Sequence, residues 1–413
     1  MKIRSLLSMA FAMLCLTSAM AQSKTVTTTS AGTLAGLLTD DEKTTVKELV
    51  VAGPLNKTDF NFINTLAALE TLDIKAATIA EETLDGTTYP ADELPKEALS
   101  KNLSIKTLLL PASVVSIGDN AVYLTMVSNV DFSACTNLKT IVKEAFYCNN
   151  YLATINLSGL KSLETIGVNA FNTCGGKATT EAPLIDLSGC SNLKEIDDYA
   201  FCNIKLNANI NLSGCTSLTR LGVSAFQNVY TPSADLSECT ALETIETKAF
   251  YTAVSSKAKM TTINLPAALK TIGDQAFNNQ KTYKSVTILA VTPPTLGTKG
   301  FYATEGVYNA TLTVPVGSKA AYEANEEWKK FKEIVESDGS SVKEFEVANL
   351  KVWTAGDAVC VAGAEEGTVV NVYDISGAPV ASATVSAGSA TLPLSAKGLY
   401  IVKAGEATVK VRL

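Results

Sequence analysis

A series of aspartate and asparagine residues recurs along the middle of the chain, each placed between two apolar residues. Its members are Asp131, Asn156, Asp186, Asn211, Asp235 and Asn264. Asn156, for example, stands between Ile155 and Leu157, and such alternation has the period of a half-buried β-strand. Successive side chains of a strand point to opposite faces, so these carboxylates and amides are predicted to form a row on an exposed face.

A second row of mostly small polar residues is predicted on the same face, two positions before the first. Together they give a candidate ligand-binding strip: Asp131, Thr154, Asn156, Asp186, Asn209, Asn211, Ser233, Asp235, Thr262 and Asn264. One interpretation is a binding strip for a protein or glycan, assisted by a cation held between neighbouring carboxylates. The alternative is a solvated strand face whose side chains bond to one another along the ladder. Asn alternates with Asp and no D-x-D-x-D-G loop occurs, so we predict no metal and no cofactor.

Catalytic residues are not evident anywhere in the sequence. The chain has no histidine among 413 residues, which excludes Ser-His-Asp and Cys-His catalysis and His-ligated zinc. Two S-x-x-K segments, Ser158–Lys161 and Ser191–Lys194, lie at repeat turns without the partner motifs of that enzyme class. We therefore expect no catalytic residue and no enzymatic activity.

The strip belongs to a repeat unit exemplified by Leu152–Phe171 (LATINLSGLKSLETIGVNAF). Other copies span Val130–Phe146, Leu184–Phe201, Ile210–Phe226, Ala234–Phe250 and Ile263–Phe277. The final Phe returns about every 24–30 residues, within the range of solenoid repeats. One unit cannot bury its own apolar face, whereas stacked units join their strands in parallel and their apolar positions into continuous rows.

The repeat resembles two known patterns. Ile185–Leu193, with Cys190, is similar to a leucine-rich repeat, and Ile272–Phe277 (IGDQAF) is similar to the second half of the BspA-type leucine-rich repeats of bacterial surface proteins. The resemblance implies a leucine-rich repeat solenoid, with a parallel β-sheet on the concave face and short turns or helices on the convex face. It also implies adhesion to host matrix proteins or to other cells.

Four of the nine cysteines occupy one slot of successive repeats: Cys135, Cys190, Cys215 and Cys239. Other repeats hold Leu160 or Ala268 there, so the slot is predicted to be buried and apolar, with free thiols. Disulfides between adjacent rungs are the alternative that an oxidising compartment would allow. Metal binding is less expected, because no C-x-x-C pair occurs.

The N-terminus predicts export. Lys2 and Arg4 precede an apolar run at 6–16 and an A-x-A site at 19–21, which together indicate a signal peptide over residues 1–21. No later run is long enough to span a membrane. The net charge of −7 disfavours nucleic acid as a partner. We expect a monomer that is secreted or associated with the outer membrane at the cell surface.

The rest of the chain is predicted to form a capped solenoid, a linker and a second domain. Residues 22–337 would form the repeat domain, with a flexible start at 22–32 and helical caps at Thr33–Glu42 and Ser318–Ile334. Residues 338–348 read as a linker. Short alternating segments separated by glycines predict a β-sandwich over residues 349–413.

The last domain resembles the C-terminal sorting domain of type IX secretion substrates. The resemblance rests on residues 372–377 (VYDISG), 398–402 (GLYIV) and 409–413 (VKVRL). It implies that the secretion machinery is a partner, and leaves open whether the domain is cleaved or anchors the protein. The combined prediction is a bacterial surface protein that binds a host or bacterial surface protein through its solenoid. A structural envelope component and a glycan-binding surface protein are the alternatives.

Overall fold

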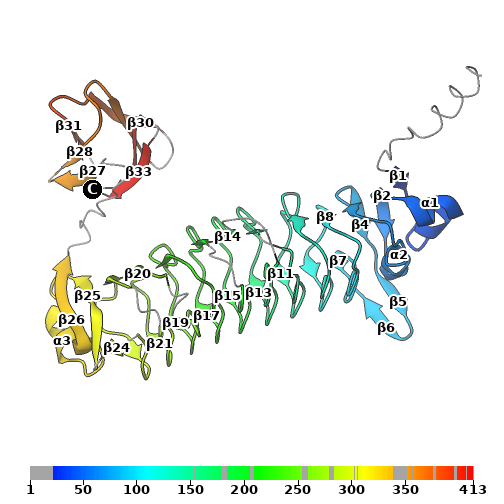
Figure 1. Cartoon of the computed structure of the whole chain (residues 1–413), viewed down its shortest axis with the longest axis horizontal. Helices are drawn as coiled ribbons and strands as arrows, with labels where there is room; N and C mark the ends of the chain where they lie inside the picture. The colour runs from blue at the N-terminus through cyan, green and yellow to red at the C-terminus, as the bar shows by residue number, and fades with distance from the viewer. Residues whose placement is uncertain are drawn as a thin grey trace, which may run out of the picture. The chain divides into compact units, whose positions relative to one another are not determined.

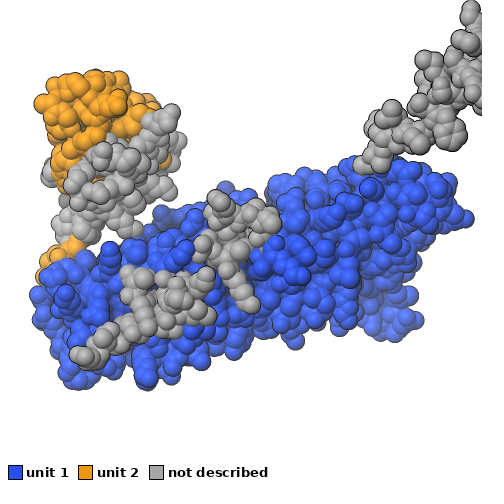
Figure 2. Space-filling view, in the orientation of Figure 1, with its two compact units in different colours: residues 1–314, 318–335 blue, residues 315–317, 336–413 orange. Residues whose placement is uncertain are grey.

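The computed structural model describes residues 22–152, 154–177, 184–204, 209–253, 259–278, 283–301, 303–304, 306–337, 351–355, 357–374, 378–394, 398–405 and 407–412 (Figure 1). The predicted signal peptide (1–21) and linker (338–348) lie outside these residues. The chain divides into two compact units, coloured separately in Figure 2: residues 1–314 with 318–335, and residues 315–317 with 336–413.

The first unit is a solenoid in which the chain passes repeatedly through two rows of parallel strands. The first row, here the Asx ladder, contains β1 (Ser23–Thr27), β2 (Glu48–Leu55), β3 (Thr71–Asp73), β8 (Thr107–Leu109), β10 (Asn129–Asp131), β12 (Ile155–Asn156), β14 (Leu184–Asp186), β16 (Asn209–Asn211), β18 (Ser233–Asp235), β20 (Thr262–Leu265), β22 (Ser285–Ile288) and β25 (Val307–Pro315). Neighbours within its sheets pair in equivalent register, as Ile185 does with Ile210.

The second row, here the Phe ladder, is one nine-stranded parallel sheet. It contains β7 (Glu93–Leu94), β9 (Ser116–Ile117), β11 (Thr140–Ile141), β13 (Thr165–Ile166), β15 (Glu195–Ile196), β17 (Arg220–Leu221), β19 (Thr244–Ile245), β21 (Thr271–Ile272) and β23 (Thr295–Leu296). The predicted solenoid is therefore confirmed. The side of the repeat expected to carry turns or helices carries two-residue strands and turns. The turns from β3 to β23 each contribute a rung to both ladders.

A column of phenylalanines runs through the core beside the Phe ladder. Its members are Phe146, Phe171, Phe201, Phe226, Phe250, Phe277 and Phe301, all with exposed fractions of 2% or less. Successive ring centroids are 5.0–5.3 Å apart and the rings are within 10° of parallel. This spacing is close to the 4.7–4.9 Å between strands, so identical side chains stack directly from rung to rung.

The N-terminal end is more ordered than the sequence suggested. The start at 22–32 was expected to be flexible, but Ser23–Thr27 forms β1, which pairs with β2 and buries Val26. The predicted helix at Thr33–Glu42 is divided into a 3-10 turn, η1 (Leu34–Leu37), and α1 (Asp40–Thr45), which Thr39 and Glu42 cap reciprocally. Four further elements follow: α2 (Lys57–Ile63), β4 (Ala77–Ile79), which pairs with β2, and β5 (Glu82–Leu84) and β6 (Thr87–Tyr89), which form a hairpin.

The C-terminal cap is only partly helical. It comprises β24 (Ala303–Thr304), α3 (Lys319–Ala324), η3 (Trp328–Lys330) and β26 (Phe331–Ser337), so the helix expected to reach Ile334 ends early. Asn325 already has extended backbone angles. The indole ring of Trp328 lies 5.9 Å from the ring of Phe301, and its Nε1 donates to the Pro294 carbonyl at 2.8 Å. The cap therefore covers the last ring of the phenylalanine column.

The second unit has two antiparallel sheets. One orders β27 (Lys351–Ala355), β28 (Ala358–Ala362) and β31 (Ser389–Pro393); the other orders β30 (Pro379–Thr384), β29 (Val369–Asp374), β32 (Leu399–Ala404) and β33 (Ala407–Arg412). Val361 and Leu392 from the first sheet share a buried core with Val372 and Val402 from the second. The predicted β-sandwich is confirmed, with β27 as an additional strand.

Candidate ligand-binding strip

The predicted strip lies along the Asx ladder. Asn156, Asp186 and Asn211 are in register on β12, β14 and β16, and Asp235 is in register with Asn264 on β18 and β20. Nine of its ten residues are exposed or half-exposed: Asp131, Thr154, Asn156, Asp186, Asn209, Asn211, Ser233, Asp235 and Thr262. Asn264 is the exception, with 4% of its surface exposed.

The Asx side chains close the turn at the end of each strand. Each Oδ1 accepts from the main-chain N–H of the serine two residues later, with N–O distances of 2.8–3.2 Å: Asp131 from Ser133, Asn156 from Ser158, Asp186 from Ser188, Asn211 from Ser213 and Asp235 from Ser237. Such Asx turns are local side-chain-to-backbone bonds. The row therefore has a structural role within each repeat. The alternative interpretation had instead expected these side chains to bond to one another along the ladder.

Asn264 shows what happens when the serine is missing. The residue two positions later is Pro266, which has no main-chain N–H to donate. Asn264 Oδ1 is buried and has no hydrogen-bond partner among the residues that the structure describes. The repeat keeps its Asx residue here but loses the turn bond, and the residue is withdrawn from the surface that a ligand would contact.

The charge of Asp131 is compensated by a residue that the sequence did not bring to attention. Lys75 Nζ lies 2.5 Å from Asp131 Oδ2. This bond and those from Ser133 lower the pKa of the Asp131 carboxyl to about 2. The rung between them carries Leu109, because Asp73, Leu109 and Asp131 are in register. Lys75 therefore reaches across one uncharged rung to Asp131. This ion pair could not be predicted without the register of the rungs.

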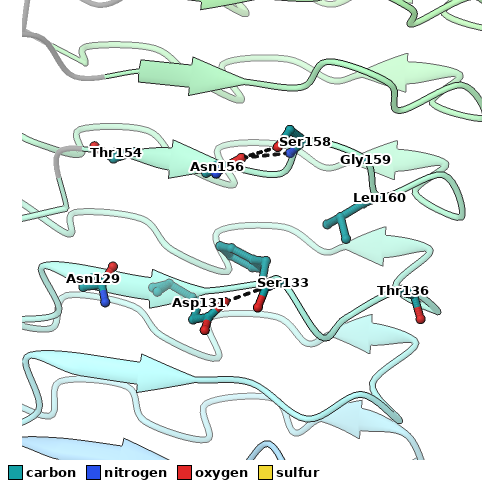
Figure 3. A pocket seen from close by; sticks show the side chains of 11 residues that line it. Asn129, Asp131, Ser133, Thr136, Thr154, Asn156, Ser158, Gly159 and Leu160 are labelled. Atoms are coloured by element: carbon teal, nitrogen blue, oxygen red, sulfur yellow. Dashed lines mark hydrogen bonds between the residues drawn. The ribbon is translucent and has the colours of Figure 1, made fainter. Parts of the chain in front are cut away.

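The Asx ladder is interrupted between β10 and β12, which belong to different sheets. A cavity of about 480 Å³ opens there (Figure 3). Its lining includes Asn129, Asp131 and Ser133 from one side, with Thr154, Asn156 and Ser158 from the other. The strip is thus a row of rungs with two interruptions, between β10 and β12 and between β16 and β18. Neither was predicted from the sequence, and the first is the one that opens into the cavity, here called the gap.

The cysteine slot is buried, as predicted. The Sγ atoms of Cys190 and Cys215 donate to the carbonyls of Leu157 and Leu187 in the preceding rung, at 3.1 and 3.2 Å. Burial raises the pKa of Cys135, Cys190 and Cys239 to about 12. Thiols in this slot are therefore held protonated, a form that is a poor nucleophile.

Two features are absent from the described part of the chain. No group of three or more His, Cys, Asp or Glu side chains is arranged to hold a metal ion. No helix there is both long enough and apolar enough to cross a bilayer.

Comparison with known proteins identifies the repeats. The family described as "BspA type Leucine rich repeat region (6 copies)" matches residues 90–184, 177–305 and 244–331, more than half of the chain. No curated protein gives a significant match.

Among solved structures, the chain is similar to a leucine-rich repeat protein from Bacteroides ovatus ATCC 8483 (17% identity, 62% of this chain and 90% of that chain covered, TM-score 0.24). It is also similar to the pneumococcal vaccine antigen PcpA (16% identity, 62% and 87% covered, TM-score 0.21). A leucine-rich cell surface protein from Faecalibacterium prausnitzii A2-165 is 14% identical (70% and 80% covered, TM-score 0.23). On the strength of the repeat match, the chain belongs to the BspA-type leucine-rich repeat family.

Proposed function

We propose that this is a secreted or surface-displayed bacterial protein without catalytic activity, and that it binds a protein ligand through the Asx ladder. One observation carries the proposal. Four polar residues at the strand starts, Asn129, Thr154, Asn209 and Thr262, make no side-chain hydrogen bond within the described part of the chain. A ligand can bond to them without breaking an existing bond, which avoids the cost of leaving a partner unsatisfied.

A protein ligand suits this surface better than a glycan. Sugar rings are commonly held against exposed aromatic faces, which supply apolar area and a polar tip. The described residues of β10, β12, β14, β16, β18 and β20 include no aromatic residue. What the strip offers is small hydroxyl and amide groups at the regular spacing of a parallel sheet, which suits the polar groups of a polypeptide.

Surface location is supported by family membership and by the predicted signal peptide. One of the similar solved structures is described as a cell surface protein. We propose that the second unit, the β-sandwich, serves as the sorting domain that the secretion machinery recognises. Deleting residues 338–413 should then leave the solenoid in the periplasm, whereas secretion of the shortened chain would contradict this role.

The test of ligand binding is an array of matrix proteins and bacterial surface proteins, probed with the full chain. The strip variant replaces Thr154, Asn209 and Thr262 with Arg. A matched control replaces Thr140, Thr165 and Thr271, which are half-exposed on the Phe ladder, with Arg. Asp131, Asp186 and Asp235 are left unchanged because their carboxylates close turns.

We expect a partner that binds the wild type and the control, and binds the strip variant at least tenfold more weakly. A partner that binds all three proteins equally would contradict the strip as the site. If no partner binds while the protein is displayed at the surface, a structural envelope role replaces the proposal.

A further inference from the structure

The gap between β10 and β12 opens on one side of the solenoid only. On the other side, Thr140 pairs with Thr165 in the Phe ladder, and the rings of Phe146 and Phe171 are 5.0 Å apart. The two turns are therefore in contact at the phenylalanine column and separate at the Asx ladder. The cavity is a wedge between two rungs (Figure 3).

Three glycines at one position of successive turns show that this rung differs from its neighbours. A Cβ atom added to Gly214 would lie 3.3 Å from the Cα of Gly189, and one added to Gly189 would lie 3.7 Å from the Cα of Gly159. A Cβ added to Gly159 would meet nothing within 4 Å. Gly159 faces the gap, where the preceding turn has drawn away.

The gap has main-chain edges on both sides. The carbonyl of Asp131 accepts from Leu110 N at 3.3 Å, on the side away from the gap, and Leu157 N donates to Asp186 O at 2.8 Å, also away from it. Alternate residues of a strand in a parallel sheet bond to opposite neighbours. Val130 and Phe132 on one edge, and Asn156 on the other, therefore present their main-chain groups to the gap. Within the described chain these groups have no ladder partner across it.

A second interruption, between β16 and β18, is closed in part by a side chain. In intact rungs the N–H of Gly159 donates to Ser188 O, and that of Gly189 to Ser213 O, at 2.7 and 2.8 Å. At the second interruption Gly214 N donates instead to Glu238 Oε2, at 2.9 Å. The equivalent N–H beside the gap belongs to Ala134. In an intact rung it would donate to a serine carbonyl of the next turn, and within the described chain no other acceptor takes the place of that carbonyl.

The chemistry of the lining suits an uncharged polar ligand. Hydroxyl and amide groups line the rim: Asn129, Ser133, Thr136, Thr154, Asn156 and Ser158. The one acidic residue, Asp131, is paired with Lys75. Val130, Phe132 and Leu160 are buried and supply the apolar part of the lining. The volume, about 480 Å³, lies within the range of small-ligand sites.

We propose that the gap binds an extended, uncharged peptide segment by main-chain pairing to β10 and β12 at once. This is β-augmentation, in which a peptide adds a strand to a free sheet edge, here between two facing edges. The proposal rests on the function proposed above and specifies which part of the protein ligand is recognised. A bound strand requires β10 and β12 to stand about two strand spacings apart, ~9.5 Å. Opening the wedge to that width breaks no ladder bond, because none joins the described residues of the two strands.

The experiment selects twelve-residue random peptides displayed on phage against the full-length protein. Synthetic copies of the enriched peptides are then measured on the wild type and on two matched variants. Thr154→Trp fills the gap. Thr165→Trp places the same side chain on the half-exposed face of β13 in the Phe ladder, outside the strip, where the strand pairs on both sides. We expect at least a thirtyfold loss of affinity for Thr154→Trp and less than a twofold change for Thr165→Trp.

Main-chain recognition has its own readout. Bound peptide should slow hydrogen exchange at the amides of Val130, Phe132 and Asn156 at least tenfold. N-methylation of alternate peptide residues removes the N–H groups that face one edge of the gap. Because both edges are proposed to bond, methylation of either the odd or the even residues should abolish binding. Binding that tolerates methylation of either set would overturn the proposal.

The remaining outcomes separate this proposal from the proposed function. Equal peptide affinity for both tryptophan variants overturns the gap as the site. The gap is also overturned as the site if no peptide is enriched while a protein partner from the array still binds the strip variant more weakly than the wild type. In that case the proposed function stands. If array and selection both fail, both proposals are overturned.

Discussion

The Phe ladder and the Asx ladder are built from the same turns of one chain, yet only the first is continuous. The Phe ladder runs unbroken from β7 to β23, whereas the Asx ladder is interrupted twice between β10 and β18. The phenylalanine column lies beside the unbroken ladder, and its ring spacing hardly varies. Repetition of one large buried side chain thus fixes the register on the Phe side. On the Asx side, the conformation of each turn determines whether neighbouring strands pair.

The turn residue accounts for the interruptions. Gly159, Gly189 and Gly214 have φ of +74°, +74° and +75°, a conformation that glycine adopts without a Cβ penalty. The preceding and following turns have Ala134 and Glu238 at this position, and neither has a positive φ. Both interruptions lie between a turn that has a glycine with positive φ at this position and a turn that does not. A change in a single turn residue can therefore open a sheet whose strands are otherwise alike.

The largest expected effect comes from a hole in the phenylalanine column. Phe201→Ala should destabilise the solenoid by about 3–5 kcal/mol, because it leaves a cavity between two stacked rings. Asn211→Ala, on the Asx ladder, should cost about 1 kcal/mol through loss of its turn bonds. Chemical denaturation followed by circular dichroism gives both values. Equal costs would contradict the assignment of stability to the Phe side.

A smaller effect separates two glycines with the same φ. Alanine at either position incurs a left-handed backbone cost of about 1 kcal/mol. Gly214→Ala should cost about 1 kcal/mol more, because its Cβ would crowd Gly189 at 3.3 Å, whereas Gly159→Ala meets open space. The same denaturation experiment applies. If Gly159→Ala were the more costly change, the gap would not exist in solution.

The Asx turns can be tested with a pair of substitutions at one residue. Asp186→Ala removes the acceptor for Ser188 N and should cost about 1 kcal/mol. Asp186→Asn keeps an acceptor oxygen and should change the unfolding free energy by less than ~0.5 kcal/mol. A large cost for Asn would show that the charge, rather than the turn bond, matters.

The smallest effect near neutral pH concerns the thiols. The pKa of Cys190 and Cys239 is raised to about 12 in the fold from an ordinary 9.0. As pH rises, the thiols of the unfolded chain therefore lose their protons before those of the folded chain. The contribution of the buried thiols to the free energy of unfolding is complete below pH 9, and it falls as pH rises above 9. Alkylation at pH 8 followed by mass spectrometry should modify the half-exposed Cys148 first. Rapid labelling of Cys190 in the native protein would contradict its burial.

Much of the solenoid could be predicted from the sequence because its signals are local and repeated. The Asx strands, the Phe slot and the cysteine slot all follow from a period that recurs within about 30 residues. The Phe ladder was missed because its strands, such as Thr165–Ile166, are too short to show alternation. β1 was missed because Val26 is its single buried apolar residue.

The site depended on relations that a single repeat does not contain. Lys75 and Asp131 meet only because two rungs align across Leu109. The gap depends on a contrast between neighbouring repeats, with Ala134 in one and Gly159 in the next. That contrast is visible in the sequence, but its consequence depends on the φ that each residue adopts.

The most direct measurement is amide hydrogen exchange of the free full-length protein, comparing Phe132 with Leu187. They occupy the same repeat position, but Leu187 N donates across an intact rung to Asn211 O at 2.9 Å, and Phe132 faces the gap. The account predicts that the Phe132 amide exchanges at least a hundredfold faster than the Leu187 amide. Equal protection of the two amides would show that β10 and β12 are paired in solution, and would contradict an Asx ladder open beside a continuous Phe ladder.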